Sequence, residues 1–85
     1  MKKVVIYTGD MCAYCTWAKE LLNKKNIKFT EYNINKDPEK REEMIKKSNG
    51  AMSVPQIFIG EYYVGGNKEL HSLEVQGKLN SILSI

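Results

Sequence analysis

The 85-residue chain has two cysteines, Cys12 and Cys15, separated by only two residues. A secreted domain of this size is usually stabilised by several disulfides. A single bridge between residues this close in sequence closes almost no loop, so it adds little to the stability of the fold. The chain must therefore fold around a hydrophobic core, and we expect the cysteine pair to be chemical or metal-binding rather than architectural.

The composition is that of an ordinary globular domain, with 42% apolar and 27% charged residues. The longest apolar run, Val4 to Tyr7, is far shorter than the roughly 20 residues of a membrane-spanning helix. It is also shorter than the apolar region of a signal peptide, which has about 7–15 residues. We therefore expect one domain over residues 1–85, located in the cytoplasm and without a membrane partner.

The charge pattern argues against a nucleic-acid partner. Lys and Arg number 13 against 10 Asp and Glu, which gives a formal net charge of +3. Positive and negative residues are interspersed along the sequence, as in residues 39–47. A nucleic-acid-binding surface typically has clustered Lys and Arg with aromatic residues between them. We expect the charges to form a solvated surface on a monomer.

Hydrophobic periodicity divides the chain into alternating strands and helices. Strands are indicated by β-branched and aromatic runs, and helices by apolar residues at helical spacing. Strands are predicted at 3–8, 27–34, 56–59 and 61–64. Helices are predicted at 13 to about 25 and at 38–47, the second with Asp37 as N-cap. A last helical region follows the N-cap candidate Asn67 and is interrupted at Gly77. The order β-α-β-α-β-β-α predicts an α/β fold, with a four-stranded mixed sheet flanked by helices.

The cysteines follow the first strand directly, at the predicted start of the first helix, where ligands usually bind in such sheets. As an N-cap, Cys12 places its sulfur beside unpaired N–H groups of Tyr14 and Cys15 and the positive end of the helix dipole. Both favour the thiolate, so we expect the pKa of Cys12 to fall to about 3.5–7.5. Cys15 lies one turn further on and is expected to be more buried. Cys12 is therefore the predicted attacking thiol and Cys15 the resolving one.

Two other interpretations of the cysteine pair are open. The cysteines could be inert apolar fillers, although the start of a helix favours a reactive thiolate. They could also supply half of a metal site. A closed zinc site needs four ligands, and His71 is the only other His or Cys in the chain. An iron–sulfur cluster shared between two chains is the remaining metal hypothesis.

Four segments together resemble a dithiol glutaredoxin: Tyr7-Thr8, Cys12-Ala13-Tyr14-Cys15, the run from Ser53 to Gly60, and Gly65-Gly66. The resemblance covers essentially all of the chain. It implies a thioredoxin fold and an enzyme that reduces protein disulfides and glutathione mixed disulfides, with glutathione as co-substrate and no required metal. The implied partners are glutathione and proteins that carry disulfides or glutathionylated cysteines.

The resemblance also implies a glutathione site beside Cys12. A cis Val54–Pro55 bond facing Cys12 would present the backbone N–H and C=O of Val54 to the cysteine of glutathione. The glycine pair would let the backbone approach the γ-glutamyl end, whose carboxylate would sit at the start of the next helix. The residues implied in glutathione binding are Tyr14, Arg41, Val54, Pro55, Gly66, Asn67, Lys68 and Glu69.

The chain departs from the family pattern at three positions. Ala13 stands where most relatives have Pro, which leaves the active-site loop less rigid. Gly9 stands where a Lys is expected to meet the glycine carboxylate of glutathione, and Arg41 is the candidate replacement. Glu69 replaces the usual Asp, which keeps the charge that could meet the ammonium of the ligand but adds a methylene. These changes bear on glutathione affinity rather than on thiol chemistry.

Two alternative functions are retained. The chain could be a redoxin of the same fold that is recharged by a thioredoxin reductase. Relatives of that kind tend to have a Trp-Ser-Gly-Phe-Arg-Pro run near the C-terminus, where this chain has Ser-Ile-Leu-Ser-Ile. It could also be a dimeric carrier that holds a 2Fe–2S cluster with Cys12 and glutathione. Assays with each reductant, and anaerobic cluster reconstitution, distinguish the three.

Overall fold

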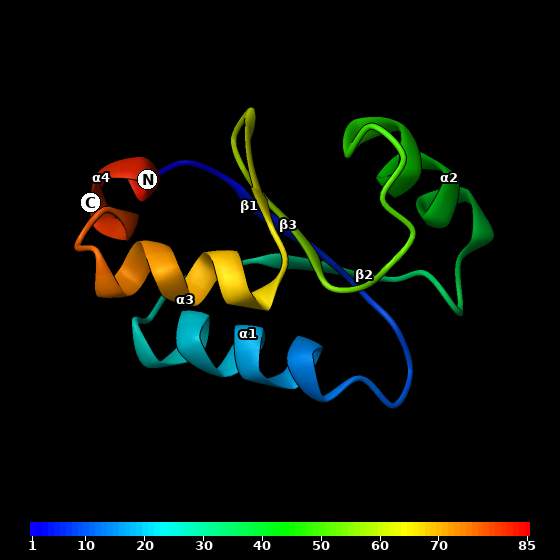
Figure 1. The fold of residues 1–85 in the computed structure, drawn as a ribbon, viewed down its shortest axis with the longest axis horizontal. Helices are drawn as coiled ribbons and strands as arrows, with labels where there is room; N and C mark the ends of the chain where they lie inside the picture. The colour runs from blue at the N-terminus through cyan, green and yellow to red at the C-terminus, as the bar shows by residue number, and fades with distance from the viewer.

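The computed structural model describes all 85 residues. Its elements follow one another as strands and helices in the predicted order, with the last helical region divided in two (Figure 1). They are β1 (Val4–Thr8), α1 (Ala13–Lys24), β2 (Thr30–Asn33), α2 (Pro38–Lys47), β3 (Gln56–Ile59), β4 (Tyr62–Gly65), α3 (Asn67–Val75) and α4 (Leu79–Leu83). No helix among them is long and apolar enough to span a bilayer.

The four strands form one mixed sheet in the order β2-β1-β3-β4. Strand β1 pairs in parallel with β2 and antiparallel with β3, and β4 pairs antiparallel with β3. Helices α1 and α3 lie side by side on one face of the sheet, and α2 covers the other (Figure 1). The predicted fold class is therefore confirmed.

The alternation of side chains along the strands explains why both faces of the sheet are covered. In β1, Val4 and Ile6 belong to the large apolar cluster, whereas Tyr7 belongs to a smaller one. In β3, Ile57 and Ile59 join the large cluster and Phe58 the small one. The large cluster includes residues of α1, α3 and α4, and the small cluster holds Met44 of α2. Each face thus has its own core.

The strand β2 starts at Thr30, later than the predicted start at Ile27. The reason lies in how α1 ends. Asn26 has a φ of +59°, and its N–H and that of Ile27 return to the last turn of the helix, at 3.0 Å from Asn23 O and 2.9 Å from Leu22 O. This is a Schellman motif, so the backbone of residues 25–27 completes the helix end instead of pairing in the sheet.

The start of α3 also differs from the prediction. Gly66, not Asn67, is the N-cap, and Asn67 is the first helical residue. The reason is a side chain one turn later: Glu69 Oε1 accepts the Gly66 N–H at 2.7 Å. Glu69 is the third residue of the helix, and its side chain gives the Gly66 N–H an acceptor that the helix backbone cannot provide.

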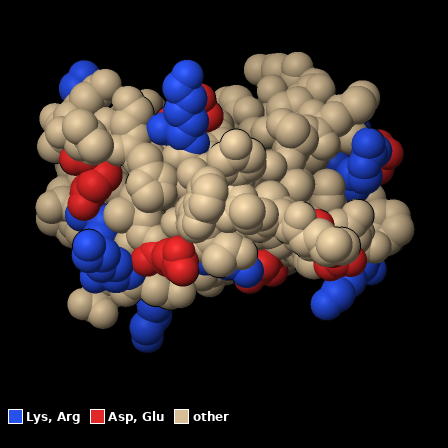
Figure 2. All heavy atoms as spheres, turned by 60° about the horizontal axis from the view of Figure 1, so that its bottom comes forward, with Lys and Arg blue, Asp and Glu red and all other residues tan.

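Acidic and basic side chains are interspersed over the face drawn in Figure 2. Opposite charges also pair directly, as in Lys19–Glu31 at 3.1 Å and Lys25–Glu74 at 3.0 Å. The face has no continuous basic stripe, in line with the interleaved charges of the sequence.

Candidate active site

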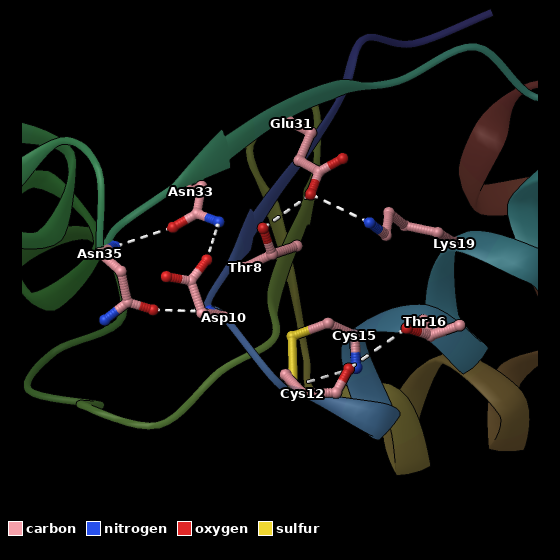
Figure 3. Close-up of polar contacts among 9 residues, drawn as sticks. All are labelled: Thr8, Asp10, Cys12, Cys15, Thr16, Lys19, Glu31, Asn33 and Asn35. Carbon is pink, nitrogen blue, oxygen red and sulfur yellow. Dashed lines mark hydrogen bonds and ion pairs between the residues drawn. A yellow bond between two sulfur atoms is a disulfide. The ribbon is translucent and has the colours of Figure 1, made fainter.

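The cysteine pair lies where the coil after β1 becomes α1. Cys12 is the N-cap, with extended φ and ψ of −116° and 102°, and its Sγ accepts the N–H of Cys15 at 3.1 Å. The two cysteines form a disulfide with Cα atoms 5.2 Å apart (Figure 3). Cys15 is buried at 2% exposure, whereas Cys12 is partly exposed. A free Cys12 sulfur in this place is reachable and faces a helix start that stabilises negative charge.

The segment that leads to Cys12 is held by two asparagines that the sequence analysis did not single out. Asn35 Oδ1 accepts the Asp10 N–H at 2.6 Å, and Asn33 Nδ2 donates to Asp10 Oδ1 at 2.9 Å (Figure 3). The N–H of Asn35 in turn donates to Asn33 Oδ1 at 2.9 Å. An asparagine at the end of a strand often accepts the N–H two residues further on, as Asn33 does, and this is the signal that could have found the pair.

Glu31 on β2 ties β1 and α1 together beside the cysteines. It accepts hydrogen bonds from the Thr8 hydroxyl at 2.7 Å and from Lys19 Nζ at 3.1 Å (Figure 3). Partial burial by itself raises the pKa of Glu31, but these two hydrogen bonds outweigh it and lower that pKa. Glu31 is therefore a carboxylate at neutral pH and keeps both bonds.

The Val54–Pro55 peptide bond is cis. The carbonyl oxygen of Val54 lies 3.8 Å from Cys12 Sγ. Neither the N–H nor the C=O of Val54 forms a backbone hydrogen bond within the chain. Val54 therefore offers a free strand-like edge directly beside the sulfur that is expected to react.

A cleft with a volume of about 880 Å³ runs along this edge. It brings together seven of the eight residues implied in glutathione binding, which are Tyr14, Val54, Pro55, Gly66, Asn67, Lys68 and Glu69. The eighth, Arg41, is exposed on α2 and does not line the cleft. The lining also includes Ser53, Gln56 and Gly65, which belong to the motif segments of the sequence but not to the eight residues implied in binding. Three further lining residues, Ala51, Tyr63 and Val64, were not singled out by the sequence analysis.

The charges in the cleft lie at its α3 end. Lys68 is exposed there, while the carboxylate of Glu69 is engaged by the Gly66 N–H. Gly65 has a φ of +106°, and a Cβ at this position would lie 3.0 Å from Glu69 Oε1. A glycine is thus favoured at residue 65, and one carboxylate oxygen of Glu69 is used at the helix start.

No group of three or more His, Cys, Asp or Glu side chains in the structure could hold a metal ion. His71, the other ligand candidate from the sequence, lies on α3 and is not grouped with the cysteines.

Comparisons with known proteins agree with this architecture. The family model for glutaredoxins matches residues 4–64. A glutaredoxin of Pseudomonas aeruginosa is 49% identical over 84 residues, covering 99% of both chains. Glutaredoxin 3 of Escherichia coli is 46% identical over 83 residues, covering 98% of this chain and 99% of the relative.

The solution structure of a glutaredoxin from Brucella melitensis superimposes with a TM-score of 0.82 at 46% identity, covering 98% of this chain and 89% of that one. Family, sequence and fold therefore lead to the same assignment. The chain belongs to the glutaredoxin family and is a thiol–disulfide oxidoreductase of thioredoxin fold, with Cys12 and Cys15 as its redox-active pair.

Proposed function

We propose that the chain uses glutathione to reduce glutathione mixed disulfides and protein disulfides, with Cys12 as nucleophile and Cys15 as resolving thiol. The observation that carries this proposal is the free backbone edge of Val54 beside Cys12 Sγ. A tripeptide with a central cysteine can add to such an edge through its own N–H and C=O groups, and this pairing aligns its sulfur with the protein sulfur.

The far end of the cleft supports the same ligand. Lys68 and the first turn of α3 line it. The N–H groups of a first helical turn are unpaired, and the helix dipole is positive there, so this end favours a carboxylate. The α-carboxylate of a γ-glutamyl group fits that requirement, whereas a thiol without a carboxylate gains nothing from it.

The reaction follows from the order of the two sulfurs. The Cys12 thiolate attacks the glutathione sulfur of a mixed disulfide, the substrate thiolate leaves, and Cys12 carries the glutathione. A second glutathione thiolate attacks that glutathione sulfur, which releases oxidised glutathione and restores the Cys12 thiolate. With a protein disulfide, the Cys12 thiolate attacks one sulfur of the substrate, the substrate S–S bond breaks, and the other substrate sulfur becomes a thiolate. The Cys15 thiolate then attacks Cys12 Sγ, which releases the second substrate thiolate. Two glutathiones reduce the resulting Cys12–Cys15 disulfide and leave as oxidised glutathione.

Single serine substitutions test these roles. Cys15→Ser should retain reduction of a glutathionylated peptide and lose reduction of a protein disulfide, because only the second reaction needs a resolving thiol. Cys12→Ser should lose both. A coupled assay with glutathione and glutathione reductase, run beside one with thioredoxin reductase, measures both activities. Turnover only with thioredoxin reductase, or activity of Cys12→Ser, would contradict the proposal.

A further inference from the structure

Gln56 follows the cis proline directly and is the first residue of β3. Its side chain is only 4% exposed, and both ends of its amide are engaged. Nε2 donates to the carbonyl oxygen of Ser53 at 2.9 Å, and Oε1 accepts the hydroxyl of Tyr63. A buried amide with both ends bonded is held in one orientation, because turning it would leave polar atoms unpaired.

The carbonyl that Gln56 binds belongs to the same peptide unit as the N–H of Val54. Only the next bond, Val54–Pro55, is cis, so the Ser53–Val54 peptide is trans. In a planar trans peptide the C=O and N–H point in opposite directions. Fixing the Ser53 carbonyl toward the side-chain amide of Gln56 therefore turns the Val54 N–H to the opposite side of that peptide, away from the Gln56 amide. The Val54 N–H has no backbone partner in the chain.

Tyr63, on the neighbouring strand β4, is 40% exposed but packs one face of its ring on the sheet. Its ring stacks on Phe58 with centroids 4.9 Å apart, and Phe58 is 3% exposed and meets Tyr7 edge-on at 5.8 Å. Burial, with the nearby charge of Glu69, raises the pKa of Tyr63 above its ordinary value. The hydroxyl therefore stays protonated at neutral pH and can donate to Gln56.

We propose that Tyr63 and Gln56 are positioning residues that set the direction of the Val54 N–H and thereby the affinity of the cleft for glutathione. This inference rests on the proposed function. The two side chains act in series: Tyr63 orients the Gln56 amide, and Gln56 orients the Ser53–Val54 peptide. Neither residue acts on the Cys12 sulfur.

Three variants test the series: Tyr63→Phe, which keeps the ring and its stacking, Gln56→Met, and the double substitution. Tyr62→Phe is the matched control, since Tyr62 is the adjacent tyrosine of similar exposure, does not line the cleft and does not bond to Gln56. Each single variant should raise KM for a glutathionylated peptide about fivefold, equivalent to about 1 kcal/mol, with little change in kcat. The KM of the double variant should equal that of Gln56→Met, because both substitutions act through the Ser53 carbonyl.

Two measurements separate positioning from a general loss of structure. The backbone amide resonance of Val54 in the free protein should shift in Tyr63→Phe and Gln56→Met and not in Tyr62→Phe. The pH dependence of Cys12 alkylation should be the same in all of them. A KM and a Val54 resonance unchanged in both single variants would overturn the inference, as would additive effects in the double variant. If the wild-type protein does not turn over the glutathionylated peptide, the proposed function is wrong. The Val54 amide resonance still tests whether Tyr63 and Gln56 set the direction of the Val54 N–H.

Discussion

Gly9 is the point where the loop before Cys12 touches two other loops, so replacing it with alanine is a sharp test of how the site is packed. A Cβ on Gly9 would lie 2.9 Å from Asn35 Oδ1 and 3.1 Å from Val54 Cγ2. Gly9 is not among the residues with positive φ. Alanine therefore suits the backbone, and any cost must come from these two contacts.

The magnitude follows from what must move. Asn35 has to withdraw, which weakens its 2.6 Å hydrogen bond to the Asp10 N–H and costs about 1 kcal/mol. Displacing the Val54 side chain adds a packing cost that is typically about 1–3 kcal/mol. We expect Gly9→Ala to lower the free energy of unfolding by about 2 kcal/mol, which for a domain of this size lowers Tm by roughly 10 °C.

Urea unfolding of Gly9→Ala, Asn35→Ala and the double variant provides the assay. Asn35→Ala alone should cost about 1 kcal/mol for its lost hydrogen bond. Adding Gly9→Ala to it should then cost about 1 kcal/mol less than in the wild type, because the closer of the two contacts is gone. If Gly9→Ala unfolds like the wild type, or costs the same in both backgrounds, the packing of the three loops is not as described.

Two further substitutions address charge. The hydrogen bond from the Tyr7 hydroxyl, with smaller effects of Lys40, lowers the pKa of Glu43, so Glu43 stabilises the fold above its unfolded pKa of about 4.3. The stability difference between wild type and Glu43→Gln, followed by urea unfolding, should be present at neutral pH and vanish as the pH falls through the lowered pKa of the folded state. In the cleft, Lys68→Gln should raise KM for a glutathionylated peptide about twofold to threefold at low ionic strength, and the effect should fade in high salt because the side chain is exposed. An equal effect at both salt concentrations would show that Lys68 acts through contact rather than charge.

The elements that sequence reasoning located well are those specified by neighbouring residues. Asp37 before Pro38 marks the start of α2, and the Asp37 carboxylate accepts the Glu39 N–H at 3.1 Å. The prediction that Cys12 is the N-cap of α1 also rested on neighbouring residues, and it is confirmed. The start of β2 was predicted too early because the alternation from Ile27 onward also suits a Schellman motif, in which Ile27 packs into the core while its N–H closes α1.

The parts of the site that the sequence did not reveal depend on contacts between distant segments. Asn35 matters because the chain after β2 returns beside Asp10, and Tyr63 matters because β4 pairs with β3 next to Gln56. Neither residue belongs to a motif, so only the fold assigns it a partner. Arg41 shows the converse: it was the candidate replacement for the Lys that is missing at Gly9, but the cleft does not include it.

The groups of the cleft that are proposed to meet the ligand are mostly main-chain groups. The N–H and C=O of Val54 and the first turn of α3 are available whatever side chains those residues have, so substituting the lining residues changes these groups only indirectly. The direction of the Val54 N–H is set by Gln56 on the Ser53 carbonyl, and the start of α3 is tied by Glu69 on the Gly66 N–H. Since a backbone donor turned away from its acceptor is lost as a hydrogen bond, the two side chains that hold these peptide groups should govern affinity more strongly than lining side chains that bind no backbone group.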